Sequence, residues 1–178
     1  RFFDDEYIFA VDSNFFEVFT FPLLHGDHMT ALKKPRSVVL TFETAKKFFG
    51  NVNPVGKVIE MDNGEPFQVT GVLEKFKGNS YLDDFDLLVS MNSIERVKKS
   101  NWNWMWTMFE TFVVLNENAD EEQFQDKLNQ LPEKYANKTL EVMGYTYEEY
   151  IAAGKEWNLY SQPFTDIHLH STNIYNRL

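Results

Sequence analysis

Short apolar runs separated by polar turns fill most of this chain, and each run is long enough for one strand. They predict strands over residues 7–11, 38–40, 57–61, 67–73, 86–89, 108–115 and 157–164. Asn63 and Gly64 lie between the third and fourth runs, and this pair favours a type I′ turn, so we expect a β-hairpin there. Gly71 is the candidate position for a β-bulge in the fourth run.

Helices are predicted where a capping side chain precedes apolar residues spaced three or four positions apart. The expected N-caps are Asp12 or Ser13, Thr41, Asn92, Asp120 and Thr146. Pro22 and Gly26 are expected to end the first helix, and Gly50, Pro132 and Gly154 are expected to end three others. In the first helix, Phe15, Phe16 and Phe19 are expected to lie in the core rather than to contact a ligand. In the helix that follows Asp120, a buried stripe is expected to contain Phe124, Leu128 and Leu131.

The composition is that of a folded, acidic domain. The 178 residues suffice for one domain or two small lobes, and folding is expected to bury about 70% of the surface of the unfolded chain. Hydrophobic residues make up 43% of the chain and aromatic residues 16%, so aromatic side chains should dominate the packing. The formal net charge of −10 argues against nucleic acids and anionic membrane surfaces as partners.

The absence of cysteine excludes several classes of site at once. Without Cys the chain has no disulfide framework, no thiolate nucleophile and no Cys-based zinc or iron–sulfur site. No apolar run approaches the roughly 18 residues of a membrane span. The chain opens on Arg1 without an initiator Met, so we expect a fragment of a longer protein. The residue chemistry alone indicates an acidic, soluble α/β domain.

Several short motifs follow one another along nearly the whole chain. They are Val11-Asp12-Ser13-Asn14-Phe15-Phe16, Pro22-Leu23-Leu24-x-Gly26-Asp27, Ser37-Val38-Val39-Leu40-Thr41, Ala45-Lys46-Lys47-Phe48-Phe49-Gly50, Asn53-Pro54-Val55-Gly56-Lys57, Phe67-x-Val69-Thr70-Gly71-Val72 and Thr165-Asp166-Ile167-His168-Leu169-His170-Ser171. In this order they are more specific than any one motif. The chain resembles the MacB-like periplasmic core domain of an FtsX-like ABC transporter permease. Within that family it is most similar to the large permeases of the Bacteroidetes type.

This resemblance implies an α+β fold of two α/β lobes, Porter-like and Sabre-like, with mixed sheets and short helices. Residues 1–178 would form one extracytoplasmic core domain, in which an inserted lobe of about 37–73 interrupts a main lobe of 1–36 plus 84–178. The domain would lie on the periplasmic face of the bacterial inner membrane. It would be looped out between transmembrane helices of the same polypeptide.

The resemblance also implies partners. Permeases of this type are expected to be dimers that couple ATP hydrolysis by a separate cytoplasmic ATP-binding subunit to export, efflux or envelope signalling. A periplasmic or outer-membrane protein is a further candidate partner. The chain has no Gly-x-x-x-x-Gly-Lys-Ser/Thr phosphate loop, which agrees with an ATPase located elsewhere. We expect no cofactor, and a monomer when the domain is isolated.

His168 and His170 are the sharpest candidates for metal ligands. In an extended segment both imidazoles project to one side, and Asp166, His25 or His28 could complete a site. In the resembling family, however, this tail is a recurring structural motif in which a His can bond backbone carbonyls. We therefore predict no metal site, and a metal-dependent hydrolase built on the two His is the weakest alternative.

Catalytic side chains show no recognisable arrangement. Neighbouring carboxylates fit an acidic surface or helix caps better than a glycosidase pair or a calcium site; they are Asp83, Asp84, Asp86, Glu148 and Glu149. No serine lies in a Gly-x-Ser-x-Gly motif, and the Gly56-Lys57 pair fits a turn into the hairpin. We therefore predict that the domain is not an enzyme.

Trp102, Trp104 and Trp106 form the candidate surface for a partner or ligand. In an extended segment the three indoles would point the same way, and one strand face rarely buries three of them. They could bind a peptide, a lipid or a protein, and the alternative function is then a free-standing periplasmic binding module. The interpretation we favour is that they seal the seam between the lobes.

Overall fold

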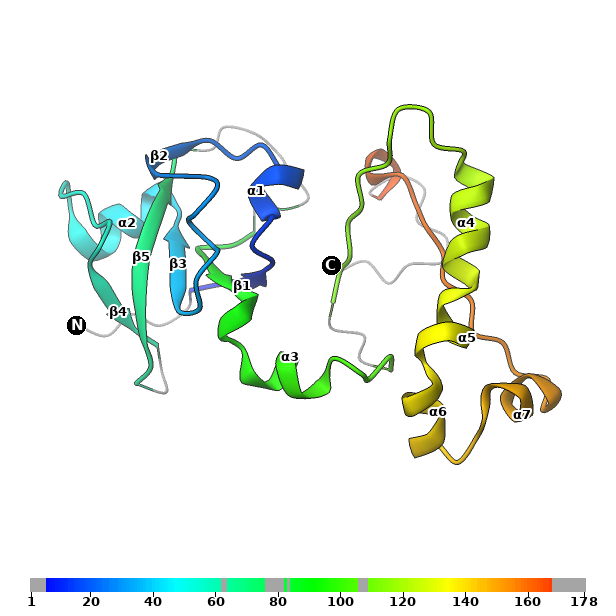
Figure 1. The fold of residues 1–178 in the computed structure, drawn as a ribbon. Helices are drawn as coiled ribbons and strands as arrows, with labels where there is room; N and C mark the ends of the chain where they lie inside the picture. Colours follow the sequence, from blue (N-terminus) through cyan, green and yellow to red (C-terminus); the bar gives the residue numbers. More distant parts are fainter. Residues whose placement is uncertain (1–5, 62–63, 76–81, 83, 106–108, 168–178) are drawn as a thin grey trace. The chain divides into compact units, whose positions relative to one another are not determined.

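The computed structural model describes residues 6–61, 64–75, 82, 84–105 and 109–167. The chain divides into two compact units, Arg1–Lys99 and Ser100–Leu178. Figure 1 shows the helices and strands of each unit. Among the described residues, no helix combines the length and the apolar character that crossing a membrane requires.

The first unit is built on a six-stranded mixed sheet. Five of its strands follow the order β1-β6-β3-β5-β2, and the sixth, β4, also pairs with β5. The strands are β1 (Ile8–Val11), β2 (Leu23–Gly26), β3 (Ser37–Leu40), β4 (Val58–Glu60), β5 (Pro66–Leu73) and β6 (Leu87–Ser90). β1 is parallel to β6 and β3 is parallel to β5, whereas the other pairs are antiparallel. The sheet thus brings together strands from both ends of this unit.

The predicted hairpin and bulge are both present on β5. Ile59 pairs with Phe67 in the antiparallel β4–β5 ladder, while residues 62–63 of its turn lie outside the described residues. Opposite β3, the register passes from Val69 directly to Gly71, so β5 carries one extra residue. That residue is Thr70, whose hydroxyl donates to the carbonyls of Ala31 and Val38 at 2.6 and 3.1 Å.

The helices of the first unit are α1 (Phe15–Val18), α2 (Phe42–Phe49), the 3₁₀ helix η1 (Met91–Ser93) and α3 (Glu95–Ser100). Thr41 is confirmed as the N-cap of α2, since its side chain accepts from the N–H of Thr44, and Gly50 ends the helix at a φ of 70°. Two predicted caps are wrong. Asn14, not Asp12 or Ser13, occupies the N-cap position of α1, and Asn92 lies inside η1 rather than at the start of α3.

The core of the first unit surrounds β3, whose four residues are all buried. On one face α2 packs over β3 and β5, and a cluster forms that contains Val38, Leu40, Ala45, Phe67, Val69, Val72, Leu87 and Val89. Aromatic rings form a second cluster, in which Phe15 stacks on Phe21 and Phe21 contacts Phe85 edge to face. Phe15 and Phe16 are confirmed as core residues with 8% exposure each, and Phe19 is half-buried.

The second unit consists of short helices, namely α4 (Glu121–Asn129), α5 (Leu131–Tyr135), α6 (Asn137–Val142), α7 (Tyr147–Ala152) and the 3₁₀ helix η2 (Phe164–Asp166). Two predicted caps are confirmed. Asp120 accepts from the N–H of Gln123, and Thr146 forms a reciprocal capping box with Glu149. Pro132 lies in the first turn of α5, so it separates α5 from α4 as expected.

The strands predicted over 108–115 and 157–164 are wrong for the residues that the structure describes there. A strand requires a hydrogen-bonded neighbour as well as β-propensity, and the described part of the second unit holds no strand. The side chain of Gln125 on α4 holds the later segment instead. It accepts from the N–H and the hydroxyl of Ser161, at 3.0 and 3.1 Å, and donates to the carbonyl of Leu159.

The predicted α+β class, with a mixed sheet and short helices, is confirmed. Strand β2 escaped prediction because Pro22 and Gly26 indicated the end of a helix there. The lobe boundaries, with an insertion of about 37–73 in a main lobe of 1–36 plus 84–178, stay a prediction. In the structure β3, β4 and β5 share one sheet with β1 and β6.

Candidate functional site

Residues 101–105 fold into turns and are not extended, so the extended segment expected there is wrong for Trp102 and Trp104. The N–H of Asn103 donates to the carbonyl of Ser100 at 2.9 Å. The side-chain oxygen of Asn103 then accepts from the N–H of Met105 at 3.0 Å. These local bonds compete with an extended backbone. Trp106 lies outside the described residues.

Thr139 of α6 fixes the backbone on both sides of Asn103. Its hydroxyl donates to the carbonyl of Trp102 at 2.8 Å and accepts from the N–H of Trp104 at 3.0 Å. The residue is only 2% exposed. Because a buried hydroxyl serves as donor and acceptor at once, this single side chain ties the tryptophan segment to α6.

The indole of Trp104 packs against aromatic rings of the same unit. It stacks on Tyr135 of α5, with ring centroids 6.4 Å apart and planes 8° apart, and meets Trp157 edge to face at 6.4 Å. The ammonium group of Lys138 lies 4.9 Å from the centre of the Trp102 ring. Trp102 and Trp104 are both half-buried, so the segment closes a seam within the helical unit.

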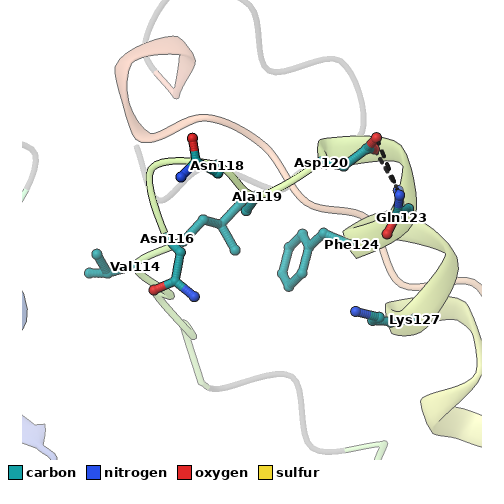
Figure 2. A pocket seen from close by; sticks show the side chains of 9 residues that line it. Val114, Asn116, Asn118, Ala119, Asp120, Gln123, Phe124 and Lys127 are labelled. Atoms are coloured by element: carbon teal, nitrogen blue, oxygen red, sulfur yellow. Dashed lines mark hydrogen bonds between the residues drawn. The ribbon is translucent and has the colours of Figure 1, made fainter.

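A pocket of about 610 Å³ lies between α4 and the segment that precedes it. Its lining residues are Val114, Leu115, Asn116, Asn118, Ala119, Asp120, Gln123, Phe124 and Lys127. Figure 2 shows the ring of Phe124 and the side chain of Lys127 directed from α4 toward the segment that carries Val114 and Asn116. The lining is mixed, with Val114, Leu115, Ala119 and Phe124 as its apolar members.

The segment beside this pocket exposes apolar side chains. Val113, Val114 and Leu115 are 56%, 73% and 39% exposed. Their backbone groups form no hydrogen bond with another described residue. Exposed apolar residues next to a hollow are typical of a docking surface rather than of a solvated loop.

The lining of the pocket carries one acid, Asp120, and one base, Lys127, whereas the sequence that leads to it is acidic. Residues 109–122 contain five acidic side chains, Glu110, Glu117, Asp120, Glu121 and Glu122, and no basic one. Residues 100–178 as a whole carry 12 acidic and 5 basic side chains, which is a formal charge of −7. A cationic partner is therefore favoured over an anionic one.

The candidate metal ligands do not converge in the described part of the chain. No group of three or more His, Asp or Glu side chains is placed there to hold an ion. The Nε2 atom of His28 pairs with the carbonyl of Phe21 at 2.9 Å, and His25 lies in β2. His168 and His170 lie outside the described residues.

Two of the candidate carboxylates, Asp86 and Glu149, have a structural role. One carboxylate oxygen of Asp86 accepts from the hydroxyl of Thr44 at 3.1 Å, and the other accepts from the N–H of Tyr7 at 3.0 Å. Glu149 belongs to the capping box of α7. Gly56, with a φ of 89°, lies in the turn before β4 as expected, where its N–H donates to the carbonyl of Val69. Asp83 lies outside the described residues.

One carboxyl shows a perturbed acidity. The side chain of Lys98, 3.0 Å from Glu95, donates a hydrogen bond to that carboxylate and attracts it electrostatically, so the pKa of Glu95 is lowered. Both side chains lie on the solvated surface of α3, three residues apart. They form an ion pair within one helix and not a reactive centre.

The pocket at Phe124 was missed in the sequence. Phe124 was expected in the buried stripe of its helix, and residues 113–115 were expected in a strand. No local pattern marks the pocket, because it arises from the way α4 lies against the segment that precedes it.

The sequence model of the MacB-like periplasmic core domain family matches residues 2–131, which is most of the chain. Among curated proteins, the pyoverdine export ATP-binding/permease protein PvdT of Pseudomonas aeruginosa is 34% identical over 77 residues. This match spans 42% of the chain and 11% of the relative.

Two solved structures share the fold. The periplasmic region of MacB from Actinobacillus actinomycetemcomitans aligns with a TM-score of 0.54 and 16% identity, over 94% of this chain and 66% of that one. A domain of a protein assigned as a permease in Porphyromonas gingivalis aligns with a TM-score of 0.55 and 18% identity, over 72% of this chain and 58% of that one. The predicted Bacteroidetes type is consistent with the second of these.

Proposed function

Because the chain belongs to the family of MacB-like periplasmic core domains, we propose that it transmits conformational change for an ABC permease that performs export, efflux or envelope signalling. The observation that carries this proposal is the family match over residues 2–131. The permease and export activities in the name of the Pseudomonas relative support transport as the class of activity. The family comprises periplasmic domains of inner-membrane permeases.

The proposal includes the remaining parts of a transporter. The chain is joined to transmembrane helices of its own polypeptide, and a separate cytoplasmic ATP-binding subunit drives the motion. The permease is a dimer, and a periplasmic or outer-membrane protein completes the assembly. The formal charge of −10 supports protein partners over nucleic acids.

In this proposal the domain performs no chemical step of its own. Two of the carboxylates that the sequence suggested, Asp86 and Glu149, are occupied by hydrogen bonds at β1, α2 and α7. A general acid or base needs instead a free lone pair or proton aimed at a cleft.

The decisive experiment is hydrogen exchange on the intact permease with its ATP-binding subunit in lipid nanodiscs. ATP turnover is expected to change amide exchange in the two units of this domain, because a transmitting domain must differ between states. An ATP-binding subunit that binds but cannot hydrolyse ATP is the control. Identical exchange with and without turnover would overturn the proposal, as would the lack of apolar spans of about 20 residues beside this domain in the intact polypeptide.

The partner or ligand surface at Trp102, Trp104 and Trp106 is a separate proposal. It is tested by the double variant Trp102→Ser/Trp104→Ser. If the second unit unfolds, the packing of these indoles on α5 and α6 accounts for their presence. A folded variant that has lost partner binding would favour the surface.

A further inference from the structure

Arg36 has a backbone conformation that its side chain does not favour. It directly precedes β3 with a φ of 59°, and in the described part of the chain it is the one non-glycine residue with a positive φ. This conformation costs free energy that glycine would avoid. A strained residue of this kind points to a role of its side chain that glycine cannot fill.

The surrounding structure holds this conformation from both sides. The N–H of Arg36 donates to the hydroxyl of Ser93 in η1 at 2.7 Å. The carbonyl of Arg36 accepts from the N–H of Gln68 in β5 at 2.8 Å, and Leu32, which is fully buried, anchors the preceding turn. Arg36 itself is exposed, so a fixed backbone presents its guanidinium group to solvent.

The hydrogen bond from Arg36 to Ser93 joins two basic segments. Residues 28–36 contain three Lys or Arg side chains and no acidic one, and residues 91–100 contain three such bases and one acid, Glu95. All six bases are exposed and belong to the first unit. We call them the basic surface, which consists of Lys33, Lys34, Arg36, Arg96, Lys98 and Lys99.

Three members of the basic surface have no counter-charge among the described residues. Lys98 pairs with Glu95 at 3.0 Å, whereas no ion pair in the described part of the chain involves Lys33, Lys34 or Arg36. The excess of acids lies mainly elsewhere, because the second unit accounts for −7 of the formal charge of −10. Cations that are held together without a partner favour an anionic ligand.

The acids of adjacent elements restrict this ligand to a narrow one. Asp12 and Glu17 follow β1, and Glu60 and Glu65 belong to the β4–β5 hairpin of the same sheet. A wide anionic surface, such as a bilayer or a nucleic acid, would also approach these carboxylates and be repelled by them. A short protein segment contacts the bases alone, and its carboxylates suit Arg36 because the planar guanidinium group binds two oxygens at once.

We propose that the basic surface binds a short acidic segment of a partner protein, and that Arg36 binds one carboxylate through both of its oxygens. The inference deepens the proposed function, on which it rests for the location of the partner outside the membrane. Its binding test uses the 178-residue chain alone, so its failure and the failure of ATP-dependent transmission are distinguishable.

The test is fluorescence anisotropy with a short labelled peptide in which Glu and Ser alternate. Saturable binding to the chain is expected, and the affinity should fall as salt is raised, since the contacts join exposed charges. The same peptide with Gln in place of Glu should bind at least about tenfold more weakly. Vesicles of phosphatidylglycerol and phosphatidylcholine, assayed by co-sedimentation, should not bind the chain.

Arg36→Gly is the decisive variant, because it separates binding from folding. Glycine suits a positive φ, so urea denaturation followed by far-UV circular dichroism should give a midpoint equal to or higher than that of the parent chain. The affinity for the Glu peptide should nevertheless fall about two- to tenfold. The double variant Lys33→Gln/Lys34→Gln should also weaken binding, through the loss of two charges.

Lys46→Gln is the matched control for the change in charge. It removes one positive charge from an exposed position on α2, outside the basic surface. The distance of this position from the bound peptide and the screening by salt should leave the affinity within about twofold of that of the parent chain.

The inference is wrong if the chain does not bind the Glu peptide or binds the Glu and Gln peptides equally. It is also wrong if Arg36→Gly binds as the parent does, or if Lys46→Gln loses as much affinity as Arg36→Gly. A lower stability of Arg36→Gly would overturn it as well, because the side chain would then serve the fold. Binding of vesicles in place of the peptide would make the ligand a lipid, and a dimer in sedimentation equilibrium that Arg36→Gly dissociates would make it a second copy.

Discussion

The link between Thr139 and the tryptophan segment predicts a large effect of removing one hydroxyl group. Thr139→Val keeps the volume and the β-branched shape of the side chain but leaves the carbonyl of Trp102 and the N–H of Trp104 without their partner. Each net hydrogen bond contributes about 1 kcal/mol, and an unsatisfied group in a half-buried seam adds to the loss. We expect the free energy of unfolding of the second unit to fall by about 2–4 kcal/mol.

Tryptophan fluorescence isolates this unit. All 4 tryptophans of the chain, at positions 102, 104, 106 and 157, belong to the second unit, so their emission during urea denaturation does not report on the first. For a unit of this size the urea dependence is about 1 kcal/mol per molar, so the midpoint should fall by about 2 M or more. Far-UV circular dichroism, which follows both units, should show an unchanged transition for the sheet.

Thr139→Ser is the matched control. It keeps the donor and the acceptor and loses only a methyl group, which costs about 1 kcal/mol. Our reasoning is refuted if Thr139→Val is as stable as the parent chain, or if the Ser and Val variants lose the same stability. Either result would mean that the indoles, and not the hydroxyl, hold the segment on α6.

Three further predictions concern the first unit. Gly26→Ala should lower the free energy of unfolding by about 3–4 kcal/mol, because the new Cβ would lie 2.5 Å from a backbone oxygen of β5 at a φ of 102°. In Gly50→Ala the new Cβ meets open space, so the loss should be only about 1–2 kcal/mol. Equal losses of stability, followed by circular dichroism, would contradict this difference. Asp86→Ala should lower the stability of the sheet by about 1–3 kcal/mol, because the hydrogen bonds from Tyr7 and Thr44 are lost. Asp86→Asn should lower it by less, and urea denaturation of the two variants checks this order. Lys98→Ala should raise the pKa of Glu95 toward its ordinary value in a carboxyl NMR titration, since both the hydrogen bond and the attraction of Lys98 are lost, and an unchanged midpoint would exclude Lys98 as the main cause.

The fold of the first unit followed from its sequence where local signals and burial agree. Thr41 and Gly50 bound α2 as predicted because a side-chain cap and a positive φ are local requirements. The bulge beside Gly71 was equally readable, since glycine in a strand marks such a position. Strand order was not readable, because β2 and β5 pair across 40 residues or more of chain and no local motif encodes that contact.

The site could be predicted only in part. The tryptophan segment was recognised from its composition, but its conformation depends on the side chain of Asn103 and on Thr139, which lies 35 residues away from Trp104. A short-range turn bond and a long-range hydroxyl bond together overrode the extended preference of the aromatic residues. Periodicity reports neither of them.

The strand predicted over 108–115 shows why local preference alone does not fix secondary structure. A segment rich in Thr, Val and Phe satisfies every local condition for a strand, yet the described chain supplies no second strand beside Val113 to Leu115. A strand forms only where a neighbouring strand donates and accepts ladder hydrogen bonds. In the described part of the second unit, the side chain of Gln125 bonds Leu159 and Ser161 instead. The strand predicted over 157–164 therefore fails for a reason that no local pattern reports, because a helix side chain occupies backbone groups that a ladder would otherwise use.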